Sequence, residues 1–150
     1  MQSQDKAQLA ELRNIRRHAA LFHVGNLICT VFAVAAGVLY ALDLGLLSMV
    51  LSIAFVLPTV LWFGASMVLY AFHAQHPNDF IGRHTRRAGW RFYAASGAAL
   101  TVVAVIQNLG VFYYVAVSSL AVIYLLWGTL HDLFRVATAE EAEIAPQPSA

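Results

Sequence analysis

Four long apolar stretches, separated by polar segments, run along this chain of 150 residues. They cover residues 19–42, 45–72, 89–108 and 111–134. A bilayer core about 30 Å thick is crossed by a helix of about 20 apolar residues, because each residue adds about 1.5 Å. The pattern therefore predicts an all-α fold, an integral membrane four-helix bundle that occupies residues 19–136.

A short polar break divides the last two stretches. Its residues are Gln107, Asn108, Leu109 and Gly110, and without it the apolar run would be about twice as long as a bilayer requires. Glycine permits backbone conformations that other residues avoid, so we expect a tight turn at 107–110. With the break between residues 42 and 45, this turn makes the bundle two transmembrane hairpins in tandem.

The segments at the two ends differ from the spans. In residues 1–18, Leu9, Leu12 and Ile15 follow helical spacing, which predicts an amphipathic cytoplasmic helix continuous with span one. Because this polar segment precedes the first apolar stretch, we expect that stretch to be retained rather than cleaved as a signal peptide. Residues 137–150 are acidic and contain prolines, so we expect a disordered cytoplasmic tail.

Composition and charge agree with a membrane protein. The chain is 60% hydrophobic and 11% charged, whereas soluble domains are about 45–50% apolar and about 25% charged. All nine lysines and arginines lie before span one, between spans two and three or in the first turn of span three, or at the end of span four. Cytoplasmic loops carry such an excess, so we expect both termini on the cytoplasmic side of a bacterial inner membrane.

Six of these cations define an expected basic cytoplasmic face. They are Arg16, Arg17, Arg83, Arg86, Arg87 and Arg91. Each basic side chain near an anionic membrane surface adds about 1 kcal/mol of attraction, so anionic headgroups are expected partners and nucleic acid is not. Asp132, at the end of span four, is expected to orient an imidazole or to pair with a loop arginine such as Arg91.

Small side chains predict the packing faces of the helices. In span one they recur every fourth residue and place one small side chain per turn on a single stripe: Gly25, Cys29, Ala33, Gly37 and Ala41. Span three has a similar small face around Gly97. Such faces let membrane helices approach closely, so we expect contact with each other, with a second copy or with another membrane protein.

Three histidines fall at comparable depth near the cytoplasmic ends of three spans. They are His23, His73 and His131. Imidazoles from different helices at one level can ligate haem iron or a transition metal. Haem or a transition metal is therefore the cofactor hypothesis that the sequence permits.

The function classes follow from these features. The leading expectation is a small, non-enzymatic accessory, scaffold or interaction subunit of a membrane complex. A haem- or metal-binding subunit and a small oligomeric channel or transporter are the alternatives. The spans lack charged residues near mid-membrane, which disfavours a proton-coupled pump. No phosphate-binding glycine loop, CxxC pair or HExxH motif is present, so an enzyme is the class we least expect.

Overall fold

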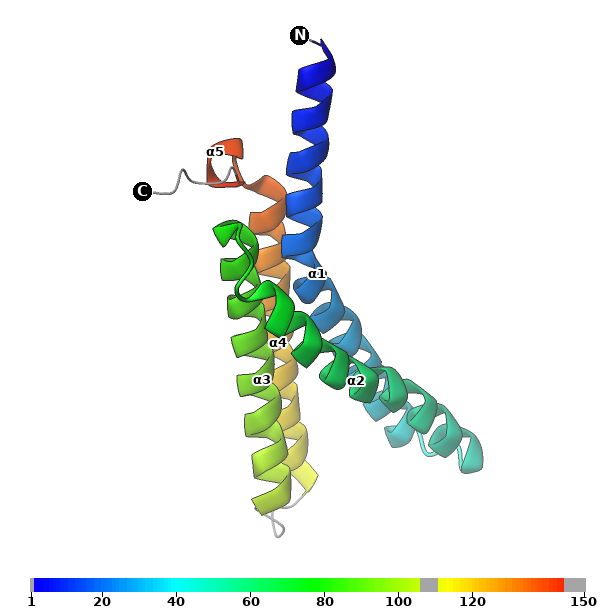
Figure 1. Cartoon of the computed structure of the whole chain (residues 1–150). Helices are drawn as coiled ribbons and strands as arrows, with labels where there is room; N and C mark the ends of the chain where they lie inside the picture. Colours follow the sequence, from blue (N-terminus) through cyan, green and yellow to red (C-terminus); the bar gives the residue numbers. More distant parts are fainter. Residues whose placement is uncertain (1, 106–110, 145–150) are drawn as a thin grey trace.

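The computed structural model describes residues 2–105 and 111–144, which form five helices in these two ranges (Figure 1). The helices are α1 (Gln2–Ala41), α2 (Leu46–His73), α3 (Asp79–Val105), α4 (Val111–Thr138) and α5 (Glu141–Ile144). The four long helices pack as a bundle, so the predicted all-α class is confirmed.

The first hairpin has nearly the predicted bounds. α1 continues without interruption from the polar N-terminal segment into the first apolar stretch. The connection to α2 uses two residues with positive φ, Asp43 at 45° and Gly45 at 66°. The Gly45 carbonyl accepts a hydrogen bond from Ser48 Oγ at 2.9 Å. α2 continues through Pro58, which has no backbone N–H to donate within the helix.

The second hairpin begins earlier than the apolar pattern predicts. α3 starts at Asp79 rather than at residue 89, because Asn78 caps it. The Asn78 Oδ1 atom accepts hydrogen bonds from the backbone N–H groups of Phe80 at 3.0 Å and Ile81 at 3.4 Å. Phe80 and Ile81 are buried, so the first turns of α3 pack against the bundle instead of forming a loop. The predicted turn at 107–110 lies outside the described residues.

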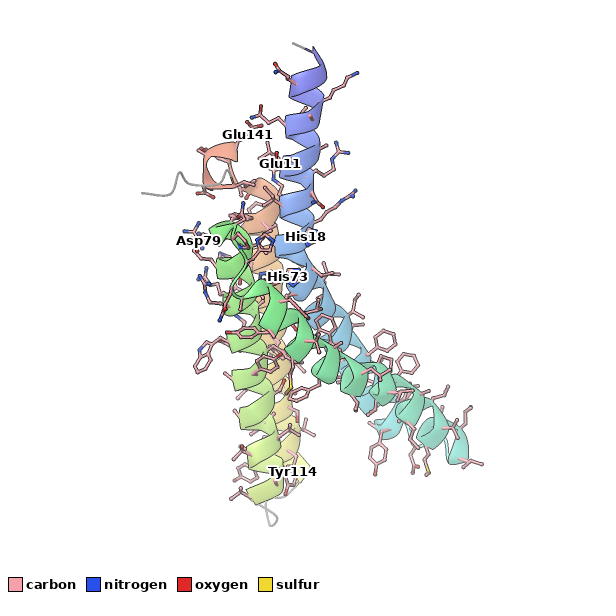
Figure 2. All side chains as sticks on the ribbon, in the orientation of Figure 1. Glu11, His18, His73, Asp79, Tyr114 and Glu141 are labelled. Carbon is pink, nitrogen blue, oxygen red and sulfur yellow. The ribbon has the colours of Figure 1, made fainter. Side chains whose placement is uncertain are left out.

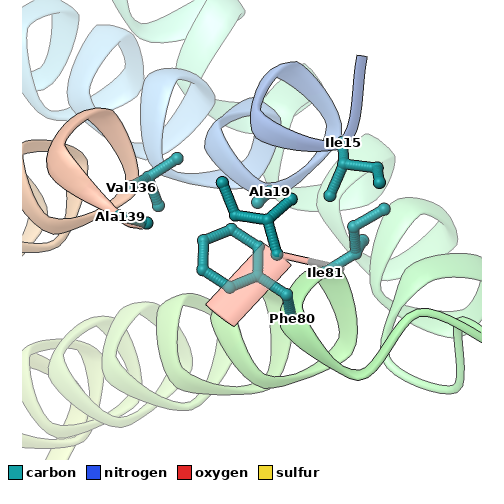
Figure 3. Close-up of a cluster of buried hydrophobic side chains, with 7 residues drawn as sticks. Ile15, Ala19, Phe80, Ile81, Val136 and Ala139 are labelled. Atoms are coloured by element: carbon teal, nitrogen blue, oxygen red, sulfur yellow. The ribbon is translucent and has the colours of Figure 1, made fainter. Parts of the chain in front are cut away.

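The two hairpins pack together at the end that holds the polar segments and diverge at the other end (Figure 1). A cluster of buried apolar side chains from α1, α3, α4 and the tail joins them there (Figure 3). Its members are Ile15, Ala19, Phe80, Ile81, Val136, Ala139 and Ile144.

The first part of the tail, residues 137–144, is folded in the structure, whereas the sequence predicted disorder. α4 continues to Thr138, and α5 folds back onto the bundle. Ile144 is fully buried, and its carbonyl accepts a hydrogen bond from Asn78 Nδ2 at 3.0 Å. Arg16 Nη2 donates to the Ala139 carbonyl at 2.7 Å. These contacts hold residues 137–144, and residues 145–150 lie outside the description.

Three of the long helices, α1, α2 and α4, are long and apolar enough to cross a membrane. Large apolar side chains stand exposed along them, including Leu46, Phe112 and Trp127. Within the described residues, α3 does not have an apolar stretch long enough to count as a candidate span. Its first three turns are polar, and its described part ends at Val105. The described chain therefore supports a multi-pass membrane protein with three candidate spans.

Candidate functional site

A buried ion pair lies where α3 and α4 meet near the tail. Asp132 on α4 is fully buried, and its Oδ2 atom lies 2.9 Å from Nη1 of Arg91 on α3. Arg87, one turn earlier on α3, is 3.9 Å from the other carboxylate oxygen. His131 Nδ1 is 3.6 Å from the same oxygen. The predicted pairing of Asp132 with Arg91 is confirmed.

A second polar pair joins α1 to α3 beside this carboxylate. His23 on α1 is fully buried, and its ring centroid lies 5.7 Å from that of His84 on α3. Neither ring nitrogen of His23 has a hydrogen-bond partner within residues 2–105 and 111–144. Asn26, one turn further along α1, donates to the Ala88 carbonyl at 3.2 Å. Polar groups of α1 thus face the arginine-bearing face of α3.

An open basic pocket lies between α3, α4 and α5, beside the buried Asp132–Arg91 pair and the His23–His84 pair. We call it the arginine pocket, and its volume is about 390 Å³. It is lined by Phe80, Arg83, His84, Arg87, Arg135, Ala142 and Glu143. Burial lowers the pKa of His84, and Arg135, Arg87 and Arg83 lower it further, against the opposing effect of Asp132. The pocket is therefore a cationic environment next to a half-buried imidazole.

The arginines of the predicted basic face divide into two groups. Arg16, Arg86 and Arg91 serve internal contacts: Arg16 and Arg86 donate to the carbonyls of Ala139 and Ala74, and Arg91 pairs with Asp132. The other three, Arg17, Arg83 and Arg87, are exposed, as Arg86 also is, and donate to no backbone carbonyl in the described part of the chain. Arg83 and Arg87 line the arginine pocket.

The structure does not bring the three predicted ligand histidines together. His23 faces His84, while His73 stacks on His18 at 5.7 Å and lies 6.3 Å from His76 (Figure 2 labels His18 and His73). His131 is beside Asp132 instead. In the described ranges, no three His, Cys, Asp or Glu side chains are grouped so that they could hold a metal ion. Equal depth along three helices did not bring the side chains onto facing surfaces.

The predicted small stripe of α1 passes through three environments. A Cβ atom at Gly25 would collide with the Trp62 indole of α2. Cys29 is buried, and Ala33 borders a cleft between the hairpins. Gly37 and Ala41 are exposed, as is Gly97 on α3; a Cβ atom at Gly37 or Gly97 would meet no described atom within 4 Å. The stripe thus packs on α2 at its start and is open at its end.

The cleft opens where the hairpins diverge, and all four long helices line it. Its volume is about 420 Å³. Small residues contribute much of its wall, and these are Cys29, Thr30, Ala33, Thr59, Ala95, Ser96, Ala99, Ser118 and Ala121. We call it the interhairpin cleft. Its surface is mostly apolar, with hydroxyl groups as the principal polar atoms.

His84 and Arg135 line the arginine pocket although the sequence pattern did not predict them as site residues. The spacing of Phe80, Arg83, His84 and Arg87 at three and four residues is a signal that could have placed them on one helical face. Their meeting with Arg135 depends on the packing of α3 against α4, which local spacing does not fix. No protein-family model, curated protein or solved structure matches this chain.

Proposed function

We propose that this chain is a non-enzymatic interaction subunit of a bacterial inner-membrane complex, and that the interhairpin cleft receives a transmembrane helix of a partner protein. The observation that carries this proposal is the small-residue wall of the cleft. Small side chains let a further helix approach the backbone closely, and dispersion contacts then drive association in lipid.

The position of the cleft supports a helical occupant. Like α3, α1 packs against the other three long helices. Its small stripe continues past the cleft as Gly37 and Ala41, which are exposed. A helix that entered between the hairpins would therefore find small residues beyond the cleft as well as within it.

The proposed orientation puts the arginine pocket in the cytoplasm. α3 would be a fourth span, so that both termini lie on the cytoplasmic side. The arginine distribution of the sequence supports this orientation.

A photoreactive amino acid at Ala99 in native membranes tests the occupant. Ala99 lines the cleft, whereas its neighbour Ala98 is exposed and does not, so Ala98 is the matched control. We expect a protein adduct of discrete mass from position 99 and none from position 98. Substitution of Ala95, one turn away in the cleft, by leucine should remove the adduct.

The mass of the adduct distinguishes partners. A product of twice the mass of the chain would identify self-association, and any other discrete mass would identify a different subunit. Lipid adducts alone at both positions would contradict a helix-receiving cleft.

A further inference from the structure

We infer that the arginine pocket is a binding site for a phosphate group, either on a membrane lipid or on a free phosphate-bearing molecule. The site lies between the first turns of α3, the last turns of α4 and the folded tail. It does not depend on the interhairpin cleft, which lies among different side chains.

Charge is the first reason. Three guanidinium groups, from Arg83, Arg87 and Arg135, line one pocket together with the single carboxylate of Glu143. Guanidinium groups present paired N–H donors that match phosphate oxygens, and they are used for phosphate recognition more than other side chains. The lining thus has the donor chemistry that a phosphate requires.

Nearby carboxylates leave this charge incompletely neutralised. Asp79 is exposed and is shared between Arg83 at 3.2 Å and Arg86 at 3.4 Å. Asp132 forms an ion pair with Arg91 at 2.9 Å and lies 3.9 Å from Arg87. Arg135 has no ion-pair partner in the part of the chain that the structure describes. Among the residues that line the pocket, three arginines stand against one carboxylate, that of Glu143, so positive charge is in excess there.

His84 forms part of the wall of the same pocket. Its Nδ1 atom is buried and has no hydrogen-bond partner within the described ranges. The ring is held by Phe80, whose centroid lies 4.6 Å away. The pocket wall thus combines the arginines with a half-buried imidazole.

The dimensions and place of the pocket suit a phosphate with a further group attached. A volume of about 390 Å³ lies in the lower part of the range of small-ligand sites, about 300–1,000 Å³. The lining residues flank the apolar stretches that start at residue 89 and end at residue 134, so they lie at headgroup depth if the helices span the bilayer. Both a lipid phosphate and a cytoplasmic phosphate would reach them.

The test uses the full-length protein in phosphatidylcholine nanodiscs, with thermal unfolding as the readout. One arm titrates inorganic phosphate at constant ionic strength, with chloride as the balancing salt. The other arm replaces part of the phosphatidylcholine with phosphatidic acid. A ligand that binds the folded state raises the midpoint of unfolding, so we expect a rise in at least one arm.

Arg135→Gln is the test variant, because Arg135 is exposed and its loss should not impair folding. Arg17→Gln removes the same charge from an exposed position of α1 outside the pocket and is the matched control. We expect R135Q to weaken the apparent affinity about tenfold or more, and R17Q to leave it unchanged. Arg83→Gln provides a second variant should R135Q fold poorly.

The two titrations distinguish a free phosphate-bearing molecule from a lipid headgroup as the source of the bound phosphate. A rise with inorganic phosphate assigns the site to free phosphate-bearing molecules, and a rise with phosphatidic acid alone assigns it to a lipid headgroup. No rise in either arm would overturn the proposal. Equal losses in R135Q and R17Q would also overturn it, because they would indicate diffuse attraction instead of a site.

Discussion

Arg91 Nη1 lies 2.9 Å from Oδ2 of Asp132, and this contact joins α3 to α4 at a point where the carboxylate has no exposed surface. Arg91 itself is only 14% exposed, so water screens the pair weakly. A buried charge needs a partner, since its desolvation is otherwise uncompensated. The pair therefore restricts how the second hairpin can pack near the arginine pocket.

Asp132→Asn should destabilise the protein strongly. The substitution leaves Arg91 with a buried, uncompensated charge, and breaking such a pair costs about 3–5 kcal/mol. Asp79→Asn is the control, because Asp79 forms an ion pair with Arg83 in which both side chains are more than half exposed; its loss should cost about 1 kcal/mol or less. Denaturation in mild detergent compares the two variants, and equal losses would show that Arg91 is not buried as described.

Gly25→Ala should weaken the packing of α1 on α2. The new Cβ atom would occupy the position of the Trp62 indole, whose Nε1 donates to Asn26 Oδ1 at 3.0 Å. Overpacking of this kind costs about 1–3 kcal/mol. Gly37→Ala adds the same methyl group to the same stripe in open space, and should stabilise α1 by up to about 1 kcal/mol. Shifts of the unfolding midpoint in opposite directions, down for G25A and up for G37A, would establish that the stripe packs only at its start.

Ile144→Ala should release the folded tail while the long helices stay intact. Ile144 is fully buried against the cluster of Figure 3, and loss of such a side chain costs about 2–5 kcal/mol. Because α5 is a single turn, this loss would open residues 139–144 locally. Digestion by a nonspecific protease should become at least about tenfold faster there. Glu140→Gln changes an exposed side chain and should leave the rate unchanged.

Much of the fold can be predicted from the sequence because lipid imposes a simple requirement. Helices α1, α2 and α4 follow apolar runs that are long enough to span a bilayer. The pairing of Asp132 with Arg91 was also predictable, since a carboxylate at the end of an apolar helix needs a counter-charge. The start of α3 was missed because its charged residues conceal the buried positions Phe80 and Ile81.

The candidate site could be predicted only in part. Hydropathy gives the depth of a residue but not the direction in which its side chain points around the helix. His23, His73 and His131 share a depth, yet His23 faces His84 and His73 faces His18. The tail illustrates a different limit: the burial of Ile144, with hydrogen bonds from Asn78 and Arg16 on other helices and segments, holds an acidic segment on the bundle, and local composition does not reveal these contacts.

His84→Gln should make the stability of the protein less dependent on pH below neutrality. Burial and the arginines Arg135, Arg87 and Arg83 lower the pKa of His84 in the folded state, and they outweigh Asp132. His23 on α1 and Glu143 on α5 are the other titratable groups that face it. As the pH falls through about 6.5, the unfolded chain takes up a proton at this residue that the folded chain does not. Stability is therefore lost as the pH falls.

Denaturation curves between about pH 5 and 8 measure this effect. The wild-type midpoint should fall more steeply with decreasing pH than that of H84Q, whereas His18→Gln, an exposed control, should follow the wild type. Parallel curves for wild type and H84Q would show that His84 does not titrate differently in the two states. Because a bound anion favours the imidazolium, a phosphate in the arginine pocket should reduce the wild-type loss and leave the H84Q curve less changed.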